Sequence, residues 1–473
     1  MSRVSVLLST FQFVRIEITR DFKMADEQNR LVSLDVFRGM TIAGMVLVNN
    51  PGTWSSIYGP LKHAEWHGIT PTDYIFPFFL FIVGVAVPIA LKKRMADGVR
   101  SGLYLKIIKR GITIFGLGLL MSMIPFFQFN DTTGIPFVVK ILLVLSFSAA
   151  LLLYLMEKRN AALVTAAGSA LTVLVFYFAG GEIVWYNFAT MRIPGVLQRI
   201  AVCYLVVSLI FLHTGWKQQA IISVALLLFY WLLMSVIPVP GCDVTTIDDK
   251  ACNLAAWLDR TILTEAHMWR SAKVFDPEGI LSTIPALVTT LSGVLAGTWI
   301  TRSSHNDAGL NTPEESEIRT NGSSIETAVG LFFFGTVFLA VGWSWSLIFP
   351  LNKSLWTSSY VVYTTGLALL SLAACYWLID IKGYRRWAWP FVIFGVNALV
   401  LFVFSGLMAR LLGMIRVAGP EGNAITLQQW IFQNAFLSWA SAVNASLVYA
   451  IAFILLWLFL MWLLYRQRIF IKV

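Results

Sequence analysis

Apolar runs of about 20 residues recur along the whole chain, and they constrain its fold more than any other feature. A helix of this length crosses the hydrocarbon core of a bilayer, whereas barrel strands show a weaker alternation over about 10 residues. Composition agrees, because 58% of the 473 residues are hydrophobic and 13% are charged. Soluble domains are about 45–50% apolar and about 25% charged. We therefore predict an all-α integral membrane protein, a polytopic helical bundle.

The spacing of the runs predicts about twelve membrane helices in a single transmembrane domain, residues 31–473. An N-terminal tail, residues 1–30, precedes this domain; a long outer loop is expected at 239–278, with a short helix NLAAWLDRTIL, and a flexible linker at 301–326. The predicted helices lie near 36–50, 73–91, 105–126, 136–156, 161–179, 195–213, 219–237, 279–300, 327–349, 356–380, 388–411 and 446–465.

The distribution of Lys and Arg predicts the orientation of the bundle. With both termini cytoplasmic, the basic linkers lie inside, and the loops that have fewer positive charges for their length lie outside. The formal charge of +10 is spread over helix ends, so it indicates topology determinants rather than nucleic-acid binding. The expected outer loops are 51–72, 127–135, 239–278, 350–355 and 412–445.

The N-terminal stretch and the cysteines bear on processing and compartment. Residues 1–30 lack the clean apolar core of a cleavable signal peptide, and Met24 is a plausible alternative start. Cys203 and Cys375 fall within apolar spans and read as small core residues. Cys242 and Cys252 share the long outer loop, where an oxidising space would allow a disulfide.

The stretch 35–88 concentrates the polar groups most suited to chemistry. Two apolar segments flank a polar loop, and polar groups clustered at the ends of membrane helices usually line a cavity. A neutral imidazole is the usual general base, a carboxylate can orient it, and an Asn can donate to a developing oxyanion. Spacing alone leaves either histidine of the loop as the base. The residues concerned are Asn49, Asn50, His63, Trp66, His67 and Asp73.

Four further groups of polar residues need partners, and each has a structural explanation as well as a functional one. The pair Asp35 and Arg38 could form an i,i+3 ion pair or have a functional role. Acidic residues at the start of a helix could cap it or hold a cationic amine. An Asn inside a helix could bridge helices. The candidate substrate-binding residues are Gln198, Arg199, Asp276, Glu278 and Asn397, together with Trp66 and Asp73 of the loop.

Several catalytic signatures are absent from the sequence. It contains no Walker-type loop, no Cys or His pairing with zinc spacing and no G-x-S-x-G elbow. ATP hydrolysis, metal-dependent hydrolysis and serine esterase chemistry are therefore poorly supported, and no metal is expected. No internal duplication is evident, which weighs against the common transporter folds.

Five motifs in the same order resemble the heparan-α-glucosaminide N-acetyltransferase family, which comprises a lysosomal enzyme and bacterial transmembrane relatives. They are SLDVFRGMTIAGMVLVNN, KHAEWHGITPTDYIFPFFLFIVG, RIPGVLQRIAVCY, FDPEGILSTIPALVTTLSGVLAG and NKSLWTSSYVVYT. The resemblance covers residues 30 to 473. The hairpin 136–179 looks like an addition, and the large lumenal N-terminal domain and first helix of the lysosomal protein have no counterpart here.

The resemblance implies an activity and assigns residues to it. The family's K-H-A-x-W motif falls on Lys62–Trp66, which implies His63 rather than His67 as the active histidine, and the cooperating Asn falls on Asn49. Family members use cytosolic acetyl-CoA to acetylate a glucosamine amine across the membrane. Asp35 and Arg38 then become candidates for binding acetyl-CoA at the cytoplasmic surface.

We accordingly expect a multi-pass acetyltransferase of a bacterial inner membrane. Its expected partners are membrane lipid, acetyl-CoA and an amino-sugar or glycan acceptor; a homodimer is left open. Two alternatives remain, an amino-sugar transporter and an O-acetyltransferase of an envelope glycan.

Overall fold

A computed structural model of the chain describes residues 31–96, 101–124, 127–128, 134–303, 313–419 and 423–471. The expected N-terminal tail, 1–30, and the middle of the expected linker, 304–312, lie outside the described residues. The described chain is almost entirely helical, with two antiparallel strand pairs, β1 (Phe127–Gln128) with β2 (Val184–Trp185) and β3 (Arg416–Ala418) with β4 (Ala424–Thr426). The predicted all-α fold class is confirmed.

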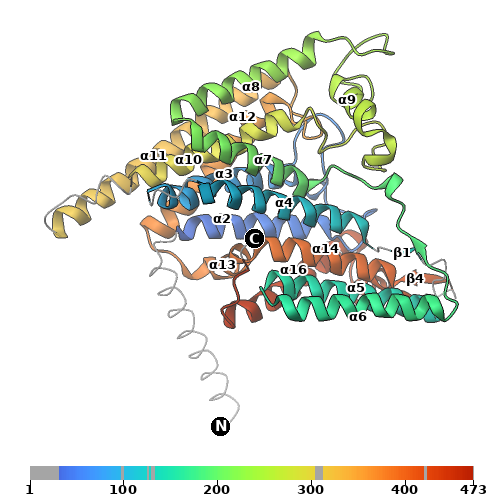
Figure 1. Ribbon diagram of the computed structural model, residues 1–473. Coiled ribbons are helices and arrows are strands. Elements are labelled where there is room, and N and C mark those ends of the chain that lie inside the picture. The colour runs from blue at the N-terminus through green and yellow to red at the C-terminus, as the bar shows by residue number, and fades with distance from the viewer. Residues whose placement is uncertain are drawn as a thin grey trace.

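Long helices make up most of the fold (Figure 1). In chain order they are α2 (Val32–Asn49), α3 (Ile75–Ala96), α4 (Ser101–Met123), α5 (Gly134–Leu155), α6 (Arg159–Phe178), α7 (Val196–His213), α8 (Trp216–Val236), α10 (Thr283–Ser303), α11 (Pro313–Ser346), α12 (Ser358–Cys375), α13 (Trp389–Val396), α14 (Ala398–Met414) and α16 (Ala442–Arg466). The shorter α9 (Leu254–Leu263) is the helix expected in the outer loop, and α15 (Leu427–Ile431) precedes α16.

The number of membrane helices is slightly lower than predicted. Among the described residues, 10 helices are long and apolar enough to cross a membrane, or 11 if the bent pair formed by 386–396 and 398–414 is one span. The twelfth predicted span corresponds to α4. This helix has the length of a span, but Lys106, Lys109 and Arg110 make its first half strongly basic.

Two predicted segments differ from the structure, each for an identifiable reason. The span expected at 388–411 is bent by 73° between α13 and α14, where Asn397 takes a non-helical conformation. The segment expected to be a flexible linker is helical from Pro313 onward. Its sequence, Pro followed by Glu-Glu-Ser-Glu, is a favourable helix start because proline suits the first turn and acidic residues favour the positive end of the helix dipole.

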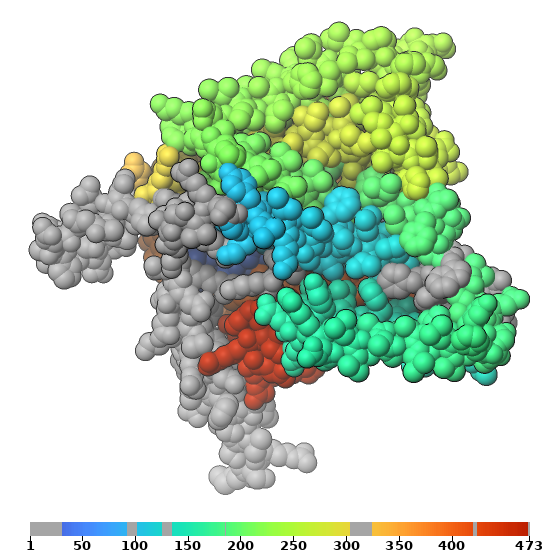
Figure 2. Space-filling model, in the orientation of Figure 1, coloured from blue at the N-terminus to red at the C-terminus, as the bar shows by residue number. Residues whose placement is uncertain are grey.

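The centre of the bundle is formed by α2, α3, α10 and α12, with α13 packed closely on the first half of α2. The α2–α13 contact depends on glycine, because a Cβ at Gly395 would lie 1.9 Å from the Asp35 carbonyl oxygen. The hairpin of α5 and α6 packs against α14 at one flank, and Figure 2 shows it separated from α4 by a furrow.

Four loops predicted to lie outside the membrane meet at one end of the bundle. The first, after α2, contacts the loop before α9 through Trp66 Nε1, which donates to the Ile247 carbonyl at 2.8 Å. It contacts the loop before α12 through the Gly68 amide, which donates to the Leu351 carbonyl. The Gly52 amide donates to the Ser446 carbonyl at the start of α16. The relative sidedness of these loops therefore agrees with the Lys/Arg pattern.

Candidate active site

The loop after α2 brings a histidine and a carboxylate into direct contact. His63 Nδ1 lies 2.6 Å from Asp73 Oδ1. The His63 side chain is 50% exposed, whereas that of Asp73 is 1% exposed. A buried carboxylate bonded to one ring nitrogen orients the imidazole and leaves the other nitrogen, Nε2, as the proton acceptor. The arrangement is that of a general base or nucleophile with its orienting carboxylate.

Asp73 is fixed by its own loop, which explains why the sequence folds this way. It lies in η2 (Pro71–Tyr74), a short 3₁₀ helix. Asp73 Oδ2 accepts hydrogen bonds from the backbone amides of Ala64 and Thr70 and from the Thr70 hydroxyl, at 3.0–3.1 Å. The Tyr360 hydroxyl of α12 donates to the Asp73 carbonyl at 2.6 Å. Oδ2 is therefore committed to the loop, and Oδ1 faces His63.

Lys353 also belongs to this group, although no pattern in the sequence pointed to it as a site residue. Its Nζ lies 2.9 Å from His63 Nδ1, 3.3 Å from His63 Nε2 and 3.5 Å from Asp73 Oδ1. Burial lowers the pKa of Lys353, while the charges of Asp73 and Glu278 act in the opposite direction. We call His63, Asp73 and Lys353 the His63 cluster.

A tight turn before α12 places Lys353. The Asn352 side chain accepts from the Leu355 amide at 2.9 Å, and the Tyr230 hydroxyl donates to the Leu355 carbonyl. Trp356 is fully buried with φ of +53°, a conformation that a bulky residue adopts only where its surroundings enforce it. The signal available in the sequence was the NKSLW motif, but nothing in it locates Lys353 beside a residue 290 positions earlier.

The neighbouring His67 differs from His63 in its bonding. Its Nε2 lies 2.9 Å from Asp248 Oδ1, and its Nδ1 lies 3.3 Å from Asn352 Nδ2. Both ring nitrogens therefore have partners from other loops. Trp66 likewise joins loops, because it donates to Ile247 and packs edge-on against Phe275.

Asn49 lies at the last turn of α2, with an exposed side chain, and α2 packs against η2. No hydrogen bond in the described part of the chain joins its amide to His63. Asn50 is buried instead, and its side chain donates back to the Val46 carbonyl at 2.8 Å. Of the two, Asn49 is thus the one whose amide faces solvent at this end of the bundle.

The acidic residues before α10 form a second charged group. Arg192 donates to both carboxylate oxygens of Asp276, at 3.0 and 2.6 Å, and to Glu278 Oε2 at 2.5 Å. Burial opposes the charge of Arg192, but these two carboxylates raise its pKa above the ordinary value. Asp276 also accepts from the Trp269 and Glu278 amides. We call Arg192, Asp276 and Glu278 the Arg192 cluster.

Arg199 and Asp259 build the turn that carries these acids. Arg199 is buried and donates to the Pro277 and Gly279 carbonyls and to the Ser282 hydroxyl. Asp259 of α9 accepts from the Ile280 amide at 2.9 Å, and burial raises its pKa to about 6. The partners that the sequence required for Arg199 are therefore mostly backbone carbonyls.

Three sequence candidates lie at the opposite end of α2 from His63. Asp35 and Arg38 form an i,i+3 ion pair at 3.0 Å, and Arg38 also approaches the Gly395 carbonyl. The buried Asn397 donates to the Ile469 carbonyl and accepts from the Ile471 amide. Asp35 precedes Asn49 by 14 helical residues, or about 21 Å. Asn397 thus connects the helix break to the C-terminal segment.

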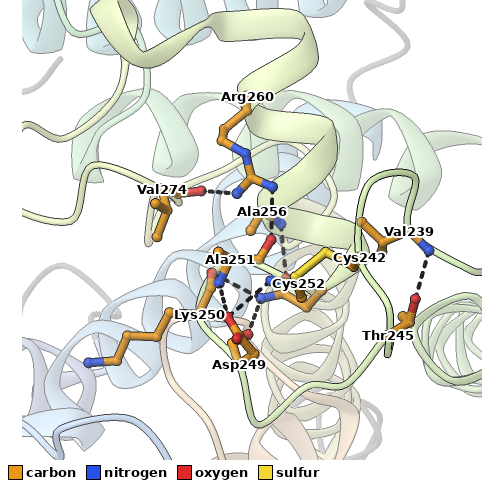
Figure 3. Close-up of a disulfide and its surroundings, with 11 residues drawn as sticks. Val239, Cys242, Thr245, Asp249, Lys250, Ala251, Cys252, Ala256, Arg260 and Val274 are labelled. Atoms are coloured by element: carbon orange, nitrogen blue, oxygen red, sulfur yellow. Dashed lines mark hydrogen bonds between the residues drawn. A yellow bond between two sulfur atoms is a disulfide. The ribbon is translucent and has the colours of Figure 1, made fainter.

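Cys242 and Cys252 are joined by a disulfide in the outer loop (Figure 3). Asp249 accepts from the Ala251 and Cys252 amides, and Arg260 of α9 donates to the Ala251 carbonyl. The loop that carries Ile247 and Asp248 toward the His63 loop is therefore cross-linked. No group of three His, Cys, Asp or Glu residues suited to a metal occurs among the described residues.

Comparisons with known proteins give matches over the His63 loop and over most of the chain. Residues 30–190, which include the whole His63 loop, match the family described as heparan-alpha-glucosaminide N-acetyltransferase, catalytic. The resemblance to the heparan-α-glucosaminide N-acetyltransferase family is confirmed. The chain is 25% identical to the Homo sapiens heparan-alpha-glucosaminide N-acetyltransferase over 94% of its own length, and 25% identical to the Mus musculus protein over the same share. It spans 60% and 61% of the lengths of these relatives.

Proposed function

We propose that this chain is a transmembrane N-acetyltransferase that transfers an acetyl group from acetyl-CoA to the amine of a glucosamine-type sugar. The observation that carries the proposal is the contact between His63 and the buried Asp73, in a loop that matches the catalytic family. The names of the human and mouse relatives support N-acetyl transfer to a glucosaminide.

His63 supplies the proton transfer in this proposal. With Nδ1–H donating to Asp73, Nε2 takes a proton from the sugar amine as the nitrogen attacks the thioester carbonyl. The tetrahedral intermediate collapses with loss of the CoA thiolate, which takes a proton from the imidazolium. In the covalent variant, Nε2 attacks the thioester first, and the amine then displaces imidazole from the acetyl group. Both routes need the ring orientation that Asp73 gives.

Asn49 and Glu278 would serve the two reacting partners. The exposed amide of Asn49 would donate to the thioester oxygen as it becomes negative, a contribution of about 3–4 kcal/mol in comparable oxyanion holes. Glu278 is bound by Arg192 through one oxygen, Oε2, and its charge reaches Lys353. Its remaining oxygen could accept from the ammonium form of the sugar. Trp66 and Asp276 are less accessible for this role because loop contacts occupy them.

The two ends of α2 would serve donor and acceptor separately. We propose that the His63 loop faces the non-cytoplasmic side, since the linkers at the other end carry the Lys/Arg excess. The nucleotide of acetyl-CoA would then enter at the cytoplasmic end, where Arg38 is partly exposed, and its pantetheine arm would extend along the helices. Both termini would be cytoplasmic, as in a bacterial inner-membrane protein.

Reconstituted proteoliposomes test this function directly. We expect acetyl-CoA on the Arg38 side and glucosamine on the His63 side to give N-acetylglucosamine, detected by mass spectrometry. Matched vesicles with both substrates on the His63 side give much less product. Movement of unmodified amino sugar without acetylation would overturn the proposal in favour of a transporter. Acetylation of N-blocked sugars alone would overturn it in favour of O-acetyl transfer.

A further inference from the structure

A cavity lies next to Arg192. It has a volume of about 500 Å³ and is bounded by the ends of α4 and α14, by the segment before α7 and by the turn at 268–270. This volume is within the range of about 300–1,000 Å³ typical of ligand pockets. Three arginines line it, Arg192, Arg270 and Arg410, and none of the described lining residues is acidic.

A buried amide faces this cavity without a partner. Gln198 is 6% exposed and lines the cavity, and its side chain forms no hydrogen bond within the described part of the chain. Two glycines make room for it. A Cβ at Gly118 or Gly195 would lie 2.4 or 2.6 Å from Gln198 Oε1. The Gln198 amide is not among the enclosed unpaired side-chain atoms of the described residues, so it opens to the cavity and is available to a ligand there.

The cavity carries an excess of positive charge. Arg192 is neutralised by Asp276 and Glu278. Arg270 bonds only to the Thr190 hydroxyl, at 3.0 Å, and Arg410 forms no ion pair among the described residues. Two guanidinium groups therefore lack a carboxylate partner. Guanidinium groups and an amide N–H₂ are donors suited to the oxygens of a phosphate, sulfate or carboxylate.

The position of the cavity selects among these anions. Its walls come from two long helices: Gly118 and Met121 lie in the last turns of α4, and Phe402 and Arg410 lie in α14. A basic pocket between membrane helices near their ends lies at the depth of lipid headgroups, where arginines can pair with an anionic headgroup. The apolar side chains Met121 and Phe402 offer contacts to acyl chains at the same place.

We infer that this cavity binds the phosphate headgroup of an anionic phospholipid, through Arg270, Arg410 and the Gln198 amide. The site adjoins the Arg192 cluster, because Arg192 lines it, and its lining includes none of the residues of the His63 cluster. Its occupant would fill the space between α4, α14 and the segment before α7. The same oxygen chemistry could come from a soluble anion, and the experiment separates the two sources.

The test uses the full-length purified protein, depleted of lipid in detergent, and native mass spectrometry. We expect short-chain phosphatidylglycerol to bind at one site and phosphatidylcholine to bind much more weakly. Arg410→Gln should weaken phosphatidylglycerol binding about tenfold, the usual effect of losing one charge-assisted hydrogen bond. Arg416→Gln is the matched control, because Arg416 is exposed nearby in β3 and does not line the cavity.

Further arms keep the result decisive if Arg410→Gln folds poorly. Arg410→Lys retains the charge and is expected to retain phosphatidylglycerol binding. Gln198→Met removes only the amide and is expected to weaken that binding. Inorganic phosphate and sulfate are titrated as competitors. Equal binding of phosphatidylglycerol to wild type and Arg410→Gln overturns the site. Binding of inorganic phosphate as tight as that of the lipid overturns the lipid headgroup as occupant.

Discussion

The His63 cluster and the Arg192 cluster lie at the same end of the bundle, yet their charges are used differently. In the Arg192 cluster, Asp276 has a 0% exposed side chain and both of its oxygens bonded to one guanidinium. In the His63 cluster, the imidazole is half exposed and only its Nδ1 is bonded to a carboxylate. The charges of the Arg192 cluster pair with one another and hold a turn, whereas the His63 cluster keeps a half-exposed imidazole that can act as a base.

This difference offers a criterion for separating candidate catalytic groups from structural ones in a membrane protein. Both clusters contain charged residues at helix ends, and sequence alone suggests function for both. What distinguishes them is how completely the fold encloses and bonds the group that would react. Among the described residues, His63 is half exposed and its Nε2 contacts only the Lys353 ammonium, whereas the Asp276 carboxylate is enclosed and bonded through both oxygens.

The largest effect is expected from Asp73→Asn. The Asn oxygen can keep the bonds from the Ala64 and Thr70 amides, so its N–H₂ would donate to His63 Nδ1. That places the ring proton on Nε2 and abolishes the base. We expect acetyl transfer to fall about 10³-fold with little change in unfolding temperature. A rate within threefold of wild type would show that Asp73 does not set the ring orientation.

Arg192→Met should do the reverse, with a large effect on stability and a small one on chemistry. It leaves the buried Asp276 without its cation, a loss of about 3–5 kcal/mol. We expect a lower thermal unfolding midpoint and, at low temperature, kcat within about tenfold of wild type. Arg270→Met, which removes a bond to Thr190 but leaves Asp276 with its cation, serves as the control for stability. A 10³-fold loss of kcat in folded Arg192→Met would erase the distinction between the clusters.

Lys353→Met should change pH dependence more than maximal rate. The Lys353 ammonium contacts both His63 and Asp73, so loss of its proton changes the charge beside the proposed base. Because burial lowers the pKa of Lys353, wild type loses this charge at a lower pH than an ordinary lysine. The variant has no such proton, so the alkaline change in rate that wild type shows should disappear. Lys353→Arg, which stays charged, should also lack it, and an alkaline change that persists in Lys353→Met would contradict the role.

The sequence predicted local relations better than long-range ones. The membrane helices, the helix within the outer loop and the nearness of Asp73 to His63 all follow from hydropathy and short spacing. The contact between Lys353 and His63 spans 290 residues and depends on how α12 packs beside α3, which no local pattern encodes. The pairing of Arg192 with Asp276 was missed for the same reason.

Other differences come from competition between local and tertiary preferences. The apolar run at 388–411 reads as one span, but Asn397 breaks it because its side chain pairs with the backbone of 469–471. His63 and His67 are indistinguishable by spacing. In the structure, His67 is bound by Asp248 and Asn352 from two other loops, whereas His63 is bound by the buried Asp73 and by Lys353.

The central claim, that His63 is the base of acetyl transfer, is tested most directly by comparing His63→Gln with His67→Gln. Glutamine retains hydrogen-bonding capacity at both positions but cannot accept the amine proton. With acetyl-CoA and glucosamine, we predict that His63→Gln loses at least about 10³-fold in initial rate, and that His67→Gln stays within about tenfold of wild type. Equal losses in the two variants, or a larger loss in His67→Gln, would contradict the account.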